Sequence, residues 1–492
     1  GGRGEFLMLA IADALELALE HQRAGRWGEA ERIYRQVLEQ RPEHPDALHL
    51  LGVLKAQRGE PVAAAALIAR AIGQNPAAPA YHNNLGNVLQ ELGRIGESLL
   101  CYEEALRLAP DYVEALVNLG NALNRLDRFG DALACYLEAQ RLRPGDPAVY
   151  VNLARALVEE GMLKEAMTCV SEALRLEPDN AQAHAVRALV WLLDGDLERG
   201  LEEYEWRWRL RPGAQREFAQ PQWDGSPLEG RRILLHAEQG LGDTIQFLRF
   251  ATTVGRAGGR VLIECQKRLV ELAATVEGVE AVVAAGDPLP GFDVHAPLMS
   301  LPRILKTRLE TIPNATPYLC APKACGAPPL PKKEGLWVGL GWAGNPTHTN
   351  NHRRSLQLTQ LAPLAQVSGV TLVSLQGGPG AEQAHSPPEG MRLLTLPQGW
   401  NELPRLAAAV ERLDLVITVD TMYAHLAGAL GRPVWVLLPF APDWRWMRER
   451  EDSPWYPTMR LFRQPARGAW APVIERVKEE LAAWAGGKRG LS

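Results

Sequence analysis

The pattern of apolar and polar residues changes once along this chain, between residues 212 and 231. The first part repeats itself at a constant interval, which is typical of stacked helical units. In the second part, short apolar runs with strand character alternate with helical segments. Such a pattern predicts parallel sheets that are covered by helices on both faces. We therefore expect an α-solenoid at residues 8–212, followed by an α/β region.

Four columns of similar residues define the repeat interval. Prolines end the second helix of each unit or open the next helix, since they cannot donate a hydrogen bond in a helix interior. Glycines suit a left-handed cap near the end of the first helix, and small residues let the two helices approach closely. The columns are Pro42, Pro76, Pro110, Pro144, Pro178 and Pro212; Gly25, Gly59, Gly93, Asp127, Gly161 and Gly195; Ala18, Gly52, Gly86, Gly120, Ala154 and Ala188; and Ala30, Ala64, Ser98, Ala132, Ala166 and Gly200. The pattern resembles the tetratricopeptide repeat over nearly all of residues 11–212, in six units.

A fifth column consists of the asparagines Asn84, Asn118 and Asn152. A side-chain amide both donates and accepts, so a ladder of amides can hydrogen-bond an extended peptide of any sequence. The column is similar to the asparagine ladder in the repeats of protein O-GlcNAc transferases, which implies a groove for a peptide. The alternative is that asparagine merely recurs in the repeat and packs between helices. The sixth unit is rich in aromatic residues and arginine at 201–212, so we expect it to dock on the region that follows.

The α/β region has seven segments with strand character, at 232–238, 260–266, 281–285, 337–343, 371–376, 414–420 and 434–439. A segment rich in Pro, Gly and Lys at 321–335 indicates a linker between two lobes. We therefore expect a linker at 213–230, a first lobe at 231–330 and a second lobe at 331–492. Ligands of open parallel sheets bind beyond the carboxyl ends of the strands, so a cleft between the lobes is the predicted site.

The first motif at such a strand end is HAEQGLGDTIQF, residues 236–247. Gly240 and Gly242 permit a tight turn and a close approach of a ligand, which makes Gly242 a candidate for donor binding. Asp243 lies at the mouth of the following helix, where it either caps the helix or faces the ligand. The glycine spacing matches neither of the two common nucleotide-binding patterns, so this loop alone does not indicate a phosphate site.

The second motif, DLVITVDTMYAHLAGALGRPVWVLLP (414–439), joins a buried strand to a helix at Asp420 and Thr421. Thr421 and the helix amides form an anion site suited to a diphosphate. His425, about one turn into the helix, either gives the same phosphate a charge-assisted hydrogen bond or is a core histidine that the backbone satisfies. Asp420 either caps the helix or contacts the donor.

Together the two motifs resemble the heptosyltransferase-like glycosyltransferases of family nine, over about residues 231–485. The resemblance implies a GT-B fold with two Rossmann-like lobes, the first on the acceptor side and the second on the nucleotide-sugar side. It implies that neither a metal nor another cofactor is needed. It further implies that Asp243 is the general base that deprotonates the acceptor hydroxyl, and that Thr421 and His425 contact the donor diphosphate.

Four more residues are predicted at the donor site. Arg353 and Arg354 lie where this family carries a basic residue that faces phosphate, although the spacing here is longer. Asn345 shares their loop, and Gln376 ends another strand beside glycines, where it is predicted to contact the base or ribose. The alternatives are that the two arginines are solvated loop residues and that Gln376 only takes part in a turn. An aromatic stretch at 439–457 forms either a wall of the site or a contact between domains.

These features predict a hexosyl- or heptosyl-transferring enzyme that modifies a hydroxyl of a protein held by the repeats, with flagellin as one candidate acceptor. A second hypothesis keeps the chemistry but makes lipopolysaccharide or another glycan the acceptor, with the repeats serving only assembly. A third hypothesis is a repeat scaffold that carries a catalytically inactive transferase fold.

Composition narrows the remaining classes. The formal net charge of −5 and the absence of a long basic run argue against a nucleic-acid partner, and no apolar run is long enough to suggest a membrane span. Six cysteines, three of which (Cys101, Cys135 and Cys169) keep the repeat interval, predict buried thiols in a reducing compartment, and we expect the cytoplasm. The opening run GGRGEF resembles a cloning remnant before Met8, and we expect no signal peptide. The repeats can also support oligomerisation.

Overall fold

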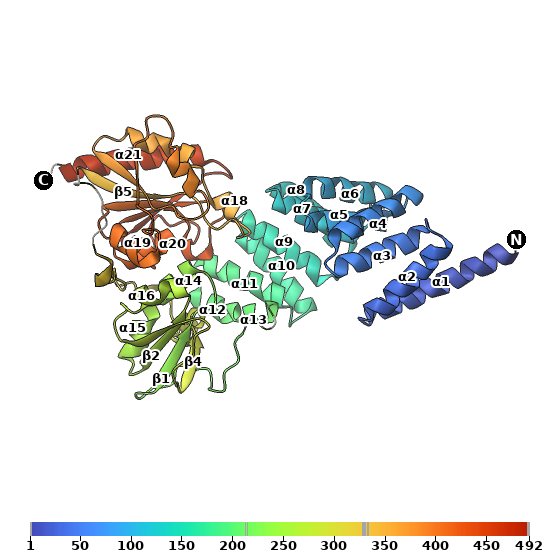
Figure 1. Ribbon diagram of the computed structural model, residues 1–492, viewed down its shortest axis with the longest axis horizontal. Coiled ribbons are helices and arrows are strands. Elements are labelled where there is room, and N and C mark those ends of the chain that lie inside the picture. The colour runs from blue at the N-terminus through green and yellow to red at the C-terminus, as the bar shows by residue number, and fades with distance from the viewer. Residues whose placement is uncertain (1, 212, 214, 327–330, 332–333, 490–492) are drawn as a thin grey trace. The chain divides into compact units, whose positions relative to one another are not determined.

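The computed structural model describes residues 2–211, 213, 215–326, 331 and 334–489 (Figure 1). The chain divides into two compact units, the first ending at Val186 and the second beginning at Arg187. The division falls inside α11 (Ala181–Asp194), so the last part of the repeat array groups with the α/β region. Pro212, the predicted end of the array, lies outside the described residues. None of the described helices has both the length and the apolar character that a bilayer crossing requires.

The first unit consists of helices that pack in consecutive pairs. α1 begins at Gly2, so this helix includes most of the opening run that the sequence analysis set apart as a remnant. The second helices of successive pairs begin at the constant interval that the repeat columns predict, as at Trp27, Pro61 and Ile95. The helices are α1 (Gly2–Arg23), α2 (Trp27–Gln40), α3 (Pro45–Gln57), α4 (Pro61–Gln74), α5 (Pro79–Glu91), α6 (Ile95–Leu108), α7 (Val113–Arg125), α8 (Phe129–Leu142), α9 (Pro147–Glu159) and α10 (Leu163–Leu176).

The glycine column has the backbone conformation that the sequence predicts. Gly25, Gly59, Gly93 and Gly161 follow the first helix of their units with φ values between 72° and 75°. Asp127, which stands in the same column in the fourth unit, has a φ of 60°. A side chain is disfavoured in this left-handed region, so Asp127 carries a conformational cost that glycine does not.

The small residues between the helices are confirmed as points of close approach. A Cβ added to Gly86 would lie 2.5 Å from Cε1 of Tyr102, and one added to Gly120 would lie 2.6 Å from Cε1 of Tyr136. Both tyrosine side chains are fully buried. Glycine therefore makes room for an aromatic ring from the second helix of the same unit. The other small column is likewise buried at Ala30, Ala64, Ser98, Ala132 and Ala166.

The second unit contains two parallel sheets in the part of the chain that the structure describes. The first has the order β3-β2-β1-β4, and all of its neighbouring strands run parallel. The winding direction therefore reverses between β1 and β4, which is where doubly wound sheets bind ligands. The loop that follows β1 carries the first sequence motif. The strands are β1 (Arg232–His236), β2 (Arg260–Cys265), β3 (Val279–Ala284) and β4 (Val294–Pro297).

The second sheet has the order β10-β9-β8-β5-β6-β7 and is also parallel throughout. This is the strand order of doubly wound dinucleotide-binding sheets, with the reversal between β5 and β8. The second sequence motif begins on β8 and therefore follows the same kind of switch point. The strands are β5 (Leu336–Gly341), β6 (Val370–Ser374), β7 (Leu393–Thr395), β8 (Leu415–Val419), β9 (Val434–Leu438) and β10 (Met459–Arg463).

Short helices connect these strands, and a long one ends the described chain. The longer helices of this region are α12 (Leu197–Tyr204), α14 (Leu241–Phe247), α15 (Arg249–Arg256), η5 (Leu358–Gln366), α19 (Leu403–Val410), α20 (Met422–Ala429) and α21 (Trp470–Arg489). The shorter ones are α13 (Arg207–Leu210), η1 (Lys267–Leu269), α16 (Val270–Ala273), η2 (Leu298–Ser300), α17 (Leu301–Ile304), η3 (Leu309–Thr311), η4 (Lys323–Cys325), α18 (Asn351–Arg354), η6 (Ala381–His385) and η7 (Trp444–Trp446).

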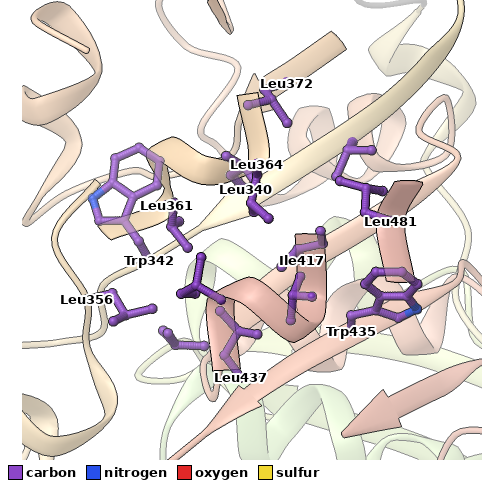
Figure 2. Close-up of a cluster of buried hydrophobic side chains, with 14 of the residues drawn as sticks. Leu340, Trp342, Leu356, Leu361, Leu364, Leu372, Ile417, Trp435, Leu437 and Leu481 are labelled. Atoms are coloured by element: carbon purple, nitrogen blue, oxygen red, sulfur yellow. The ribbon is translucent and has the colours of Figure 1, made fainter. Parts of the chain in front are cut away.

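A continuous hydrophobic core supports the second sheet. Strand residues such as Leu340, Ile417 and Leu437 pack with Leu361 of η5 and Leu481 of α21 (Figure 2). All five are at most 1% exposed. Because β5, β8 and β9 are anchored in this way, the loops at their carboxyl ends have a rigid base.

The seven predicted strands are confirmed, and their ends differ from the prediction by no more than a few positions. β4, β7 and β10 were not predicted. Part of the predicted linker at 213–230 also belongs to the first lobe, because the N–H of Trp223 donates to the carbonyl of His295 at 2.7 Å, and Leu228 is buried. The predicted linker at 321–335 falls partly on residues 327–330 and 332–333, which lie outside the described residues.

Candidate functional site

The two sequence motifs lie next to each other. α14 carries Gly242 and Asp243, and α20 carries His425. A Cβ added to Gly242 would lie 3.0 Å from Cδ2 of His425 and 3.6 Å from Cα of Met422. Helix α20 therefore approaches Gly242, at a position where the sequence predicted the approach of a ligand. Two helices that each follow a strand at a switch point thus meet at one place.

Asp243 accepts two hydrogen bonds. Its Oδ2 accepts one from the backbone N–H of Gly240 at 2.9 Å. Gly240 is the N-cap residue of α14, so Asp243 caps the helix from the N3 position of a capping box and is not itself the N-cap residue. Its Oδ1 accepts one from Nη2 of Arg445 at 2.6 Å. A carboxylate has about four lone-pair sites, so both oxygens keep acceptor capacity. The side chain is 25% exposed, so a further donor can reach it.

Arg445 belongs to the aromatic stretch and joins groups from both lobes. Its Nη1 donates to Oδ1 of Asp443 at 2.9 Å, and its Nε donates to Oε1 of Gln246 at 2.6 Å. The guanidinium carbon lies 4.6 Å from the centre of the Trp444 ring. With its bond to Asp243, Arg445 connects α14 to the loop that contains η7. The aromatic stretch therefore holds the lobes together, which supports the hypothesis of a contact between domains. Its role as a wall of the site stays a prediction.

Asp420 places a further carboxylate beside this pair. Burial, together with the charge of Asp443, raises the pKa of Asp420 to about 6, while Arg354 and Arg445 act in the opposite direction. Burial also acts to raise the pKa of Asp443, but the charge and hydrogen bonds of Arg445 hold it below its ordinary value. Thr421, and not Asp420, is the N-cap residue of α20, so the capping hypothesis for Asp420 is wrong.

His425 is a neutral side chain here. Burial, reinforced by the charge of Arg445, lowers its pKa to about 3. The ring stacks on Trp446 with centroids 5.4 Å apart, and its Nδ1 lies 3.0 Å from the hydroxyl of Tyr456. A neutral imidazole still has one N–H donor, and a hydrogen bond from it to an ionised phosphate oxygen is charge-assisted through the phosphate, so the contact of His425 with the donor diphosphate stays a prediction. The hypothesis of a core histidine is right about burial, although the hydrogen-bond partner of the ring is the hydroxyl of Tyr456 and not a backbone group.

Several buried N–H donors of the site have no partner among the described residues. They include Nε2 of Gln246, beside Arg445, and Nε of Arg354. The Thr421 side chain does not cap α20; its hydroxyl lies 3.4 Å from the carbonyl of Val419. Unsatisfied buried donors are costly in a folded protein, and here they come from both lobes. This chemistry suits a ligand that offers only acceptors.

The remaining predicted donor residues have different surroundings. Gln376 does not face a ligand, because its Oε1 accepts from the N–H groups of Trp342 and Ala343 at 3.0 Å, and its Nε2 donates to the carbonyls of Ala343 and Pro379. The prediction that it contacts the base or ribose is therefore wrong: it fixes the loop after β5. Asn345 is exposed and accepts a hydrogen bond from the N–H of Thr347 at 3.1 Å.

Of the two arginines of α18, Arg354 is seen to act on other residues of the site. Arg354 packs on Gly344, since a Cβ there would lie 3.2 Å from its Nη2. Its charge acts on both Asp420 and His425, which places it in the site. Arg353 is partly exposed on the same short helix. The effects of Arg354 on Asp420 and His425 make Arg354 a candidate for the cation of the site.

The asparagine column of the first unit has a structural role at two positions. Nδ2 of Asn84 lies 2.8 Å from Nε2 of His49, and Nδ2 of Asn118 donates to Oδ1 of Asn83 at 2.9 Å. These bonds join α3, α5 and α7, so the hypothesis of packing between helices is confirmed for Asn84 and Asn118. Asn152 is partly exposed and has no side-chain hydrogen bond to any described residue. It is the member of the column whose amide is free for a peptide.

The end of the repeat array contacts the first lobe, as expected. Nε2 of Gln239 donates to the hydroxyl of Tyr204 at 3.0 Å, and the Tyr204 ring lies 6.4 Å from that of Trp444. Arg207 forms an ion pair with Glu238 at 3.0 Å. Tyr204 thus lies beside the predicted catalytic loop. The aromatic and arginine content of 201–212 was the only sequence signal for this role.

Two residues that shape the site gave no sequence signal. Met447 has a φ of 50° directly after η7, a left-handed conformation that is unusual for a residue with a side chain and typical of functional sites. Arg249 of α15 is buried and donates to the carbonyl of Trp455 and, at 3.2 Å, to the hydroxyl of Tyr318. Both features depend on contacts between distant segments.

No cluster of three or more His, Cys, Asp or Glu side chains suited to a metal ion occurs among the described residues. A shallow hollow in the first unit is lined by residues of α8, α9 and α10. They are Gln140, Tyr150, Met167, Thr168, Cys169, Ser171, Glu172 and Arg175.

Comparison with known proteins supports the repeat assignment. Models of the tetratricopeptide repeat match residues 15–79, 83–147 and 126–190. The chain is similar to Protein FlbA of Caulobacter vibrioides, with 27% identity over 469 residues that cover 90% of this chain and 73% of that protein.

Solved structures give weaker similarities. Pseudomonas aeruginosa pilF is 23% identical with a TM-score of 0.39, over 43% of this chain and 95% of its own. YrrB, described as a TPR protein with an unusual peptide-binding site, is 22% identical with a TM-score of 0.31. The match covers 37% of this chain and 93% of YrrB. The repeat models and the sheets of the structure together show a chain that carries tetratricopeptide repeats, which suggest protein–protein interaction, followed by an α/β region of parallel sheets.

Proposed function

We propose that the chain is a metal-independent glycosyltransferase of the GT-B type, which moves a sugar from a nucleotide diphosphate to a hydroxyl of a protein. One observation carries the proposal: α14, the helix that carries Asp243, meets the N-terminal part of α20, with Gly242 next to Met422 and His425. Each comes from the switch point of its own doubly wound sheet, where such sheets bind ligands. Metal independence follows from the resemblance to family nine.

The donor diphosphate is assigned to the mouth of α20. A diphosphate offers only acceptor oxygens, and Gln246 and Arg354 offer N–H donors that lack partners in the described chain. The helix amides and the positive end of the helix dipole favour the same charge. Arg354 supplies the cation, and Thr421 and the neutral His425 supply additional donors.

The transfer is a direct displacement. The acceptor oxygen forms a bond to the anomeric carbon while its proton passes to Asp243. The bond from the anomeric carbon to the phosphate oxygen breaks, and its electron pair leaves with the nucleoside diphosphate. Arg354, Thr421, His425 and the helix amides stabilise the charge that develops on that leaving group. Asp243 is suited to the role of general base because two hydrogen-bond donors hold its carboxylate in place and its oxygens keep free lone pairs.

The acceptor is assigned to the protein class because the chain carries tetratricopeptide repeats. The free amide of Asn152 offers both a donor and an acceptor to an extended peptide. Flagellin is a suitable first protein acceptor for the test. Lipopolysaccharide is the second acceptor, which tests the glycan hypothesis.

The test is turnover by the Asp243→Asn variant with a panel of nucleotide sugars. Loss of the base should reduce kcat by about 10²-fold or more while binding of the donor, measured by thermal shift, is kept. Asp287→Asn, an exposed carboxylate after β3 in the same lobe, is the matched control and should behave like the wild type.

Mass spectrometry of the acceptors identifies the product. Sugar on protein supports the proposal, whereas sugar only on lipopolysaccharide contradicts the acceptor class. Undiminished turnover by Asp243→Asn removes Asp243 from its role. Failure of the wild type to bind or use any nucleotide sugar contradicts the enzyme proposal.

A further inference from the structure

Arg445 is a charged residue that connects the two lobes at the site. Its three side-chain nitrogens each donate to a different residue: Nη2 to Asp243 of α14, Nη1 to Asp443 of its own loop, and Nε to Gln246 of α14. The side chain is 7% exposed and lies over the Trp444 ring. A planar guanidinium can hold several acceptors in a fixed geometry, which a lysine ammonium cannot.

We propose that Arg445 is a positioning residue for the transfer reaction, which fixes the Asp243 carboxylate against the mouth of α20 without touching the reacting atoms. This assignment rests on the proposed function. It is not part of the family resemblance, because the stretch at 439–457 has no counterpart in the motifs that carry that resemblance.

The protein contacts of Arg445 explain why it acts through Asp243. Each of the three guanidinium nitrogens donates to a protein oxygen and the side chain is only 7% exposed, so these contacts hold Arg445 in place against Asp243. The backbone supports the same geometry, since Met447, two residues later, is held at a φ of 50°. A strained residue persists only where its surroundings determine the conformation. The loop therefore presents Arg445 in one arrangement.

Arg445 also balances the charge of the site. Three carboxylates lie around it, those of Asp243, Asp420 and Asp443, and Arg354 is the other cation that acts on Asp420. The titratable groups that face Asp243 and Arg445 from the packed elements are Tyr204 of α12, His348 in the loop after β5, Arg354 of α18 and His425 of α20. Of these, His425 is neutral and the pKa of His348 is lowered by burial, so neither replaces the charge of Arg445.

Removal of the cation should therefore change the pH dependence as well as the rate. In Arg445→Met, the carboxylates lose their ion pair and take up protons at higher pH, so the acid limb of kcat/KM should move up by about one pH unit. Loss of the fixed geometry should lower kcat by about 10²-fold. Arg445→Lys restores the charge but not the three-way contact, so its acid limb should return toward the wild type while kcat stays reduced by about tenfold.

The experiment measures pH–rate profiles of the full chain with a nucleotide sugar and a protein acceptor. Arg450→Met is the matched control, because Arg450 forms an exposed ion pair with Asp452 in the same loop and should leave the profile unchanged. Circular dichroism and the donor-induced thermal shift report on folding and donor binding for each variant.

The outcomes separate this assignment from the proposed function. A shift of the acid limb in Arg445→Met that Arg445→Lys reverses supports the assignment. A loss of rate in both variants with no change of pH profile indicates a purely structural role and overturns it, as does wild-type behaviour of both. Absence of turnover in the wild type with every donor overturns the proposed function, and the assignment with it.

Discussion

Replacement of Gly120 by alanine tests how closely the paired helices of a repeat approach. The added Cβ would lie 2.6, 2.8 and 3.1 Å from three ring atoms of Tyr136. Carbon atoms in favourable contact are about 3.5 Å or more apart, so the ring or its helix must move by roughly 1 Å. The ring is fully buried, and its hydroxyl is bonded to Asn121 at 2.7 Å and Asn124 at 3.0 Å, so rotation out of the way is blocked. Overpacking of this kind should destabilise the first unit by about 1–3 kcal/mol.

The matched control is Gly130→Ala in the same repeat. A Cβ there meets nothing within 4 Å, and alanine is the better helix former, so this change should raise stability by up to ~1 kcal/mol. Urea unfolding followed by the helical circular-dichroism signal gives both values. The double variant Gly120→Ala, Tyr136→Leu should recover part of the loss, because leucine removes the ring. If Gly120→Ala costs as little as Gly130→Ala, the close contact does not limit packing and the reasoning is refuted.

Three other predictions concern the first unit. Asp127→Gly should stabilise it by about 0.5–1 kcal/mol in urea unfolding, since glycine adopts the φ of 60° freely; no gain would contradict the strain at this cap. Burial lowers the pKa of His49 from 6.5 to about 4, so the unfolded chain binds a proton that the folded chain does not. Stability should then fall as the pH drops from about 6.5 to 4, by at most about 1.4 kcal/mol per pH unit, and the dependence should be shallower in His49→Gln. Asn118→Ala should cost about 1 kcal/mol of stability, whereas Asn152→Ala should leave stability unchanged and weaken binding of a peptide acceptor; equal effects in both assays would contradict their separate roles.

The repeat array could be derived from the sequence almost completely. Gly93 and Gly120 show why: each is required by local geometry, either a left-handed cap or a ring that belongs to the same pair of helices. Such constraints recur once in every unit and are therefore visible as columns. The strands of the α/β region that were missed are short or interrupted: β4 contains His295 and Pro297, β7 spans only Leu393–Thr395, and β10 contains Arg460 and Arg463.

The candidate site was only partly accessible to sequence reasoning. The motifs around Asp243 and His425 located the two helices that meet, because each combines a strand end with a helix start. The ionisation of His425 could not be derived, since it depends on burial against Trp446 and Tyr456. Gln376 has the residue type of a base-reading side chain, but backbone groups from two loops occupy its amide. Such partners come from separate parts of the chain and leave no local pattern.

The division of the chain inside α11 assigns the last repeat to the second unit. Tyr204 and Arg207, which contact the loop of Asp243, belong to this unit together with the two parallel sheets. The last repeat is therefore a shared part, which belongs to the repeat array by its sequence pattern and to the α/β region by its contacts. A truncated variant would have to keep this repeat in order to keep these contacts with the loop of Asp243.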